Sequence, residues 1–326
     1  MELILKEGYT EHSSPICFSY AVLMYTVLKR PQLGKAFAQL ADNLEEKCYA
    51  PDVASATHFM RAFGLMHWTH HPKTKLGYLR EAFQKNMEAG NLQFATYSRT
   101  VDFTCYHISL PLNDVFAQMQ ESMQFLKKIN NYSWSRHYQL IAKMISVFMG
   151  KRIDLNEFNA IWEKVEQDSP AMRVGSYAEY SEFNYFMGNY PVALHYAKKF
   201  FKEKDYNIGF IGTSYGWWFY GLALCKAYPT RSFFKKLQIK WILSRIMREL
   251  AYISKLYPPN FRFMLDSLRA EVGIISGASF AHVQQSYLAA IDTALENGYF
   301  NYAALISEHA GAYFITQNME ALAKES

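Results

Sequence analysis

The chain is poor in the residues that carry covalent and metal chemistry. It has 326 residues but only 4 cysteines, and no two of them form a Cys-x-x-Cys pair. This scattering argues against a disulfide framework or a zinc-thiolate cluster. We expect the cysteines to be reduced and buried, as in a cytoplasmic protein. The four are Cys17, Cys48, Cys105 and Cys225.

Long apolar runs are missing as well. Charged residues interrupt each apolar stretch before it reaches the length of about 20 residues that a transmembrane helix needs. Glu2, Lys6 and Glu7 break up the first apolar residues, so no secretory signal pattern is present. These observations predict a cytoplasmic protein. The net charge of +5 is small and shows no focused patch of the kind that nucleic-acid binding requires, so we expect no nucleic-acid partner.

The sequence also lacks the common catalytic motifs. The segment Gly34-Lys35-Ala36 has neither the leading glycine nor the hydroxyl of a phosphate-binding loop, and no kinase His-Arg-Asp or Asp-Phe-Gly is present. Residues 212–216 read Gly-Thr-Ser-Tyr-Gly, but they lie in a helical, aromatic-rich run and not at the turn of a nucleophile elbow. We therefore expect no enzyme and no cofactor, with an active site outside known motifs as a third hypothesis.

One histidine cluster is a candidate metal site. His67, His70 and His71 have spacings of three and four, which can place two imidazoles on one helix face as zinc requires. No cysteine or carboxylate follows at ligand spacing, and Pro72 ends the helix. The sequence favours a solvated helix end, where histidine suits the negative end of the helix dipole, and no metal site is expected.

Aromatic residues are abundant, at 17% of the chain, which excludes a disordered chain. The clearest local pattern is at residues 185–201, where two helices meet across a short turn. Gly188 suits a left-handed position just past a helix end, and Pro191 suits the first turn of the next helix. Tyr190 and Ala193 are expected to fill the helix crossing, with a large residue against a small one.

Similar hairpins recur along the chain. Pro31, Pro72 and Pro111 are 41 and 39 residues apart, each between the two helices of a pair. No segment alternates apolar and polar residues for long, so no sheet is expected. A helical repeat near 40 residues is typical of an α-solenoid. We predict an all-α fold of about eight antiparallel helical hairpins in a single domain over 1–326. The predicted helices cover 14–30, 33–47, 53–70, 75–88, 92–109, 114–129, 134–149, 155–166, 172–187, 192–202, 210–227, 232–256, 261–275, 280–297 and a last one from 299.

Gly188-x-Tyr190-x-x-Ala193 resembles the turn signature of tetratricopeptide repeats, although Ala197 and Phe200 exchange the usual order of the later aromatic and small positions. The resemblance implies a right-handed superhelix whose first helices line a concave face that grips peptides. It also places a partner site on aromatic and amide side chains of two successive first helices. These are Tyr177, Tyr180, Asn184, Tyr215, Trp217 and Trp218. Core packing is expected to explain at least half of the rings.

A longer pattern is similar to the helical region of large bacterial signalling proteins that combine a kinase-like domain, a nucleotide-binding ATPase of the AAA/STAND type and a sensor histidine kinase. It includes Leu268-x-Ala270-Glu271 and runs on through Tyr287, Ala290, Ala294 and Gly298. The resemblance implies a scaffold or regulatory module that binds a protein or the flanking domains of its own polypeptide. It also implies that the chain is a fragment of a larger protein or a stand-alone relative. An effector-sensing domain with a small ligand or peptide in the aromatic groove is the alternative.

The segment from Arg231 to Arg248 is basic and contains no acidic residue. A helix of this kind suits an anionic membrane surface or an acidic partner. The favoured interpretation is a repeat helix whose apolar face packs on its neighbours while its cations stay in water. A membrane partner is therefore possible but not favoured. The lysines that define this basic helix are Lys235, Lys236 and Lys240.

Overall fold

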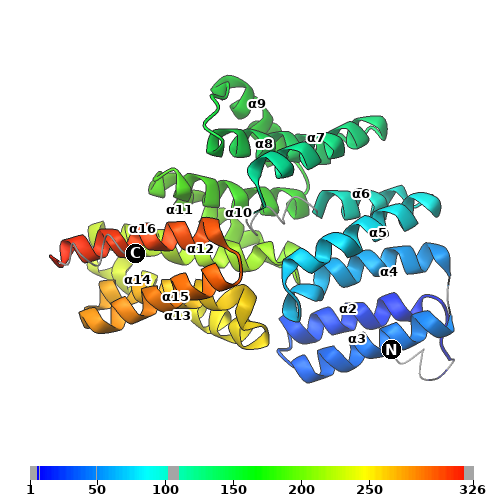
Figure 1. Cartoon of the computed structure of the whole chain (residues 1–326), viewed down its shortest axis with the longest axis horizontal. Helices are drawn as coiled ribbons and strands as arrows, with labels where there is room; N and C mark the ends of the chain where they lie inside the picture. Colours follow the sequence, from blue (N-terminus) through cyan, green and yellow to red (C-terminus); the bar gives the residue numbers. More distant parts are fainter. Residues whose placement is uncertain (1–5, 7, 49, 102–109, 319–326) are drawn as a thin grey trace. The chain divides into compact units, whose positions relative to one another are not determined.

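The computed structural model describes residues 6, 8–48, 50–101 and 110–318. Within these ranges the chain forms helices and turns and no strand, so the all-α prediction is confirmed for them (Figure 1). The first α-helices are α2 (Ser13–Thr26), α3 (Pro31–Lys47), α4 (Pro51–Gly64), α5 (Lys75–Glu88), α6 (Leu92–Val101), α7 (Leu112–Lys128) and α8 (Tyr132–Phe148). They are followed by α9 (Leu155–Glu166), α10 (Pro170–Phe186), α11 (Tyr190–Glu203), α12 (Gly212–Ala227), α13 (Phe233–Leu256), α14 (Pro258–Ser276), α15 (Phe280–Glu296) and α16 (Phe300–Thr316).

The described helices belong to two compact units. The first takes in α2 to α6, Asn113–Ser135 and the short segment Ile208–Ile211. The second takes in Arg136–Asn207 and the chain from Gly212 to the end of α16. The expectation of one repeat domain over 1–326 stays a prediction.

Helices pack on their sequence neighbours in both units. In the first unit α2 packs on α3, α4 on α5 and α5 on α6, while α2 also packs on α4 and α4 on α6. In the second unit α10 packs on α11, α14 on α15 and α15 on α16, while α10 also packs on α12 and α12 on α14. Each unit therefore combines hairpin contacts with contacts between every second helix.

One type of turn joins the helices of four hairpins. Each connection has three residues, and the middle residue has a positive φ, as expected for Gly188. The N–H of the residue after it donates to a carbonyl five residues back, which satisfies an orphan carbonyl of the ending helix in a Schellman motif. The middle residues and their φ values are Gly90 (70°), Asn130 (55°), Gly188 (72°) and Gly298 (73°). The donor–acceptor pairs are Asn91–Asn86 (2.8 Å), Asn131–Leu126 (2.9 Å), Asn189–Asn184 (2.8 Å) and Tyr299–Ala294 (2.8 Å).

The next helix of each such hairpin begins in the same way. Five residues after the positive-φ residue a small side chain is buried, and these residues are Ala95, Ser135, Ala193 and Ala303. At one crossing the helices come close enough for the Ser181 hydroxyl to donate to the Ala193 carbonyl at 2.9 Å. The prediction of a small residue at this crossing is confirmed, because a larger side chain would hold α10 and α11 apart.

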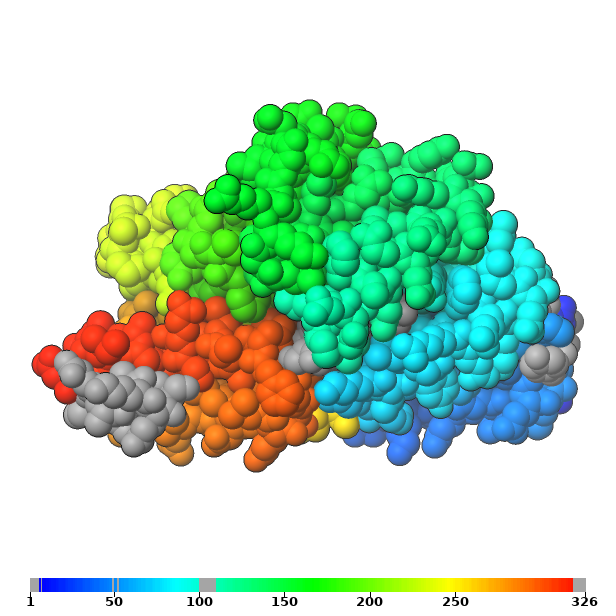
Figure 2. All heavy atoms as spheres, turned by 45° about the horizontal axis from the view of Figure 1, so that its top comes forward, coloured from blue at the N-terminus to red at the C-terminus, as the bar shows by residue number. Residues whose placement is uncertain are grey.

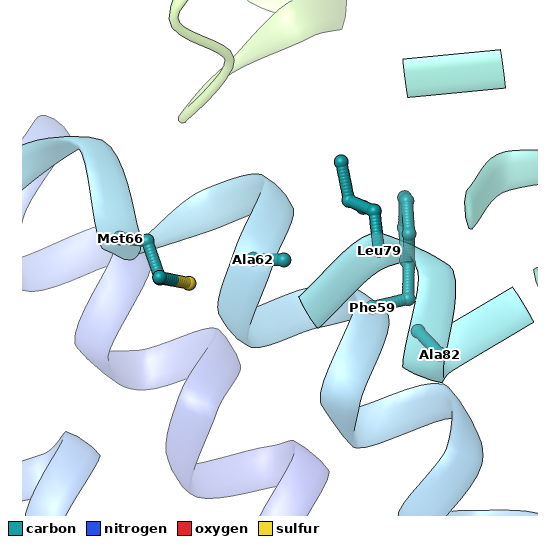
Figure 3. Packing of buried hydrophobic residues seen from close by; sticks show 5 residues of the cluster. All are labelled: Phe59, Ala62, Met66, Leu79 and Ala82. Atoms are coloured by element: carbon teal, nitrogen blue, oxygen red, sulfur yellow. The ribbon is translucent and has the colours of Figure 1, made fainter. Parts of the chain in front are cut away.

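The core of the first unit contains a cluster between α4 and α5 (Figure 3). Phe59 and Ala62 come from α4, Leu79 and Ala82 from α5, and Met66 follows the end of α4. Burial of such side chains contributes about 1.5–3 kcal/mol for each large one, and this supplies the stability of the helix pair.

The second unit has a core rich in rings and in buried polar side chains. Atoms of α15 and α16, coloured orange to red, lie on the face that Figure 2 shows. Leu305, Ile306 and Phe314 of α16 are buried, while Phe300 and Ile315 at its two ends are exposed. The expected second helix of an eighth hairpin, at 318–326, falls almost wholly outside the described residues. None of the helices that the structure describes is long and apolar enough to cross a membrane.

Two predicted helix boundaries are wrong for local reasons. Pro31 does not separate two helices but stands at the start of α3, where its missing N–H costs nothing. The helix predicted for 53–70 ends at Gly64, and a turn of 3₁₀ helix follows at Met66–Trp68. The indole N–H of Trp68 donates to the Gly64 carbonyl at 3.0 Å and satisfies this helix end. Part of the helix predicted for 92–109 lies outside the described residues.

Candidate functional site

The six side chains of the predicted partner site do not share one exposed surface. Four of them, Tyr177, Asn184, Tyr215 and Trp218, are buried, while Tyr180 and Trp217 are partly exposed. Packing within the second unit therefore accounts for more than half of them. Partner binding through the remaining surface stays a prediction.

Trp218 is a core residue of the second unit. Its ring is fully buried and packs 5.4 Å from Phe263 and 5.1 Å from Tyr302, measured between ring centroids. The indole N–H donates to the Ser267 hydroxyl at 2.9 Å. Both the ring and its polar atom are satisfied inside the protein, so Trp218 joins α12, α14 and α16.

Tyr177 and Tyr180 belong to a different ring cluster, one that reaches the surface. Trp162 lies 4.3 Å from Tyr180 between centroids, and its indole N–H donates to the Tyr196 hydroxyl at 3.0 Å. The ammonium of Lys199 lies 5.3 Å from the centre of the Tyr177 ring and 5.0 Å from that of Tyr196, which is cation–π range. Sequence patterns did not indicate Trp162, Tyr196 and Lys199, because this cluster combines residues from three helices and its Trp162–Tyr196 hydrogen bond spans 34 residues of the chain.

A buried carboxylate, Glu271 on α14, connects five helices. Its Oε1 lies 2.9 Å from His309 Nδ1 on α16, and it accepts a hydrogen bond of 3.0 Å from the Tyr287 hydroxyl on α15. Lys226 on α12 donates to the same oxygen at 3.4 Å. The far side of the imidazole, His309 Nε2, lies 3.4 Å from the Tyr185 hydroxyl on α10.

The surroundings of Glu271 favour its charged form. Burial by itself raises the pKa of a carboxyl group, but the hydrogen bond and charge of His309, the charge of Lys226 and the Tyr287 hydroxyl lower the pKa of Glu271 to about 2. Burial and the Glu271 charge raise the pKa of Tyr287, so this phenol stays protonated as a donor. The carboxylate is thus a permanent charge that its neighbours compensate.

Glu179 on α10 is a second buried carboxyl group, and its pKa is shifted in the direction opposite to that of Glu271. Burial, together with the charge of Glu182, raises the pKa of Glu179 well above its usual range. Burial lowers the pKa of His137 to about 4, although Asp168 opposes this shift. Burial therefore disfavours the charged form of both groups where His137 Nε2 lies 3.5 Å from Glu179 Oε2. His137 Nδ1 lies 2.8 Å from the Ser176 hydroxyl.

The order Glu271, His309, Tyr185 is that of a carboxylate–imidazole–hydroxyl relay. All three side chains are buried, and burial raises the pKa of Tyr185 well above its usual range, so it makes a poor nucleophile. Ser214, at the centre of the 212–216 string, lies buried in the first turn of α12. These groups hold helices together and offer a substrate no access.

The histidine cluster does not form a metal site. Among the described residues no three histidine, cysteine or carboxylate side chains stand close enough to hold an ion. The expectation of a solvated cluster is wrong for His67, which is fully buried. Burial and the charge of Lys75 lower the pKa of His67 well below its usual range. The described cysteines, Cys17, Cys48 and Cys225, are free, and Cys17 and Cys225 are buried as expected.

The basic helix is α13, where Lys235 and Lys240 are exposed and Lys236 is half-buried. The expectation that its whole apolar face packs on neighbours is wrong for its first half. Ile239, Leu243 and Ile246 are buried, but four large apolar side chains remain exposed. They are Phe233, Phe234, Leu237 and Trp241.

In comparisons with known proteins, no family model, no curated protein and no solved structure matches the chain.

Proposed function

We propose that the chain is a non-catalytic scaffold or regulatory module that binds a protein. The observation that carries this proposal is the shared hairpin: the same turn, followed five residues later by a buried alanine or serine, in four places. Contacts between alternate helices, such as α10 with α12 and α12 with α14, support stacking of the hairpins into an α-solenoid. In such a stack most contacts join neighbouring hairpins, although α16 here also reaches α10, where the Tyr302 hydroxyl donates to Glu182 at 2.8 Å. The outward faces of a stack stay available to a partner.

The burial of the polar clusters supports the non-catalytic part of the proposal. Catalysis requires that a substrate reach the reacting atoms, and Glu271, His309 and Tyr185 are enclosed by helices. The module acts in the cytoplasm, within a signalling protein or beside one, in keeping with its resemblance to the helical regions of large bacterial signalling proteins. Its partner is a separate protein or a flanking domain of the same polypeptide.

An effector-sensing domain is the second candidate. Trp162 is buried, while Tyr180 and Tyr196 are only partly buried. Lys199 lies at the edge of these rings and pairs with Glu166 at 2.6 Å. A small aromatic ligand or a peptide would suit these rings.

Melting temperatures separate the two candidates, because a ligand that binds only the folded state stabilises it. A ligand at 100 times its dissociation constant adds about 2.7 kcal/mol. We expect a protein partner isolated from the source cell to raise the melting temperature in a saturable manner, and metabolites to leave it unchanged. The effector-sensing domain would be favoured over the interaction module if a metabolite raised the melting temperature. This effect should then be lost in Tyr180→Ala and kept in the exposed control Tyr132→Ala.

A further inference from the structure

The first half of α13 presents large apolar side chains to solvent. Phe233 is 69% exposed, Phe234 80%, Leu237 50% and Trp241 60%. They recur at spacings of one, three and four residues, which places them along one side of an α-helix. The residues that fix α13 to the second unit, Ile239, Leu243 and Ile246, lie on the opposite side. The exposed rings therefore form a strip along the outward face, where the buried contacts of the helix do not reach.

The borders of this strip are positively charged. From Arg231 to Arg248 the chain has six cations and no acidic residue. The guanidinium of Arg245 lies 4.9 Å from the centre of the Trp241 ring, and the ammonium groups of Lys236 and Lys240 lie 5.2 Å and 5.8 Å from that of Tyr228. Lysine and arginine beside tryptophan and phenylalanine are the composition of helices that lie in a membrane interface.

The neighbouring helix α11 adds to this charge. Lys198 is exposed, and its pKa is lowered by partial burial and by the charges of Arg231 and Lys235. Mutual repulsion among cations on two elements shows that this surface is short of counter-charge. An anionic partner would relieve it.

We propose that the outward face of the first half of α13 docks on an anionic lipid surface, with the helix lying in the plane of the headgroups. The rings stand out from a convex helix side, with Phe233 and Phe234 5.7 Å apart between centroids, so they can enter between headgroups without a shaped pocket in the partner. The cations beside them face the lipid phosphates and carboxylates. This inference is independent of the proposed protein-binding function.

The test uses the full chain and two kinds of vesicle, phosphatidylcholine alone and phosphatidylcholine mixed with phosphatidylserine, in a sedimentation assay. We expect binding to the mixed vesicles only. The variant Lys235→Gln/Lys236→Gln/Lys240→Gln loses three cations near the surface, which lowers the partition coefficient on the order of 100-fold. The variant Phe234→Ser/Trp241→Ser keeps the charge and lowers it about tenfold or more, because two rings no longer enter the interface.

Matched controls change equally exposed residues elsewhere. Lys127→Gln/Lys128→Gln/Lys164→Gln removes the same charge, and Leu155→Ser/Phe300→Ser removes apolar side chains that are 66% and 57% exposed. Both controls should bind mixed vesicles within about twofold of the wild type, and circular dichroism should show every variant folded. The proposal is overturned if the wild type binds no vesicles, binds both kinds equally, or loses binding as much in the controls. Capture by polyglutamate without vesicle binding would assign the strip to an acidic protein instead.

Discussion

Replacing Glu271 by glutamine should lower the free energy of unfolding by about 3 kcal/mol at pH 7. The lowering of the pKa of Glu271 to about 2 measures how strongly His309, Lys226 and Tyr287 favour its charge. Each pKa unit corresponds to about 1.4 kcal/mol, and removal of one partner of a buried charged group costs about 3–5 kcal/mol. Glutamine keeps the shape but leaves Lys226 without its counter-charge and offers His309 and Tyr287 only a neutral acceptor. Denaturant unfolding followed by circular dichroism measures the loss.

The pH dependence identifies the carboxylate as the source of this stability. The pKa of Glu271 is about 2 in the folded protein and about 4.3 in an unfolded chain. Its contribution is therefore complete above pH ~4.3 and disappears as the pH falls through about 2. The difference between wild type and Glu271→Gln should shrink over this window. The control Glu308→Gln changes an exposed carboxylate on α16 and should cost under about 0.5 kcal/mol. Equal losses in both variants would show that Glu271 is not held as a compensated charge.

Trp218→Ala should destabilise the protein by about 3–5 kcal/mol, the usual cost of truncating a large buried ring. The ring is enclosed by Phe219, Phe263 and Tyr302, and its N–H bonds to Ser267. The replacement therefore leaves a cavity and removes one hydrogen bond to the Ser267 hydroxyl, which keeps its bond to the Met264 carbonyl at 3.2 Å. The same unfolding experiment measures both effects together.

The adjacent Trp217 provides a matched control within the same helix. It is only partly buried, and its indole nitrogen has no hydrogen-bond partner among the residues that the structure describes. We expect Trp217→Ala to cost less than half as much as Trp218→Ala. Similar costs for the two variants would contradict the assignment of Trp218 to the core. If Trp218→Ala kept its stability but no longer bound a partner protein, Trp218 would belong to the binding site.

Local sequence signals were sufficient to predict the bounds of a helix where its own residues mark its start and its end. The bounds of α5 and α9 agree with the predicted 75–88 and 155–166. In α9 this follows from Asp154, whose side chain accepts from the N–H groups of Asn156 and Glu157 and caps the helix. Gly188 was predictable for the same reason, since a positive φ at a helix end favours glycine.

Features that depend on distant contacts could not be predicted. Tyr185 and His309 are 124 residues apart in the chain, and nothing near either residue in the sequence indicates the other. The predicted partner site failed to separate rings in the core from rings at the surface, because Tyr215 and Trp218 share the helical pattern of their exposed neighbours. The free side of α13 was missed because an apolar residue on a helix predicts burial, and only the packed structure shows which ones lack a neighbour.

The repeated hairpin is most directly tested by amide hydrogen exchange at its turns. The N–H groups of Asn91, Asn131, Asn189 and Tyr299 lie in connections between helices, where an ordinary loop would leave them exposed to water. Because each donates to a carbonyl five residues back, we predict exchange as slow as that of the helical amides beside them. Exchange of these four amides at the rate of an unstructured peptide would contradict the common turn on which the proposed function depends.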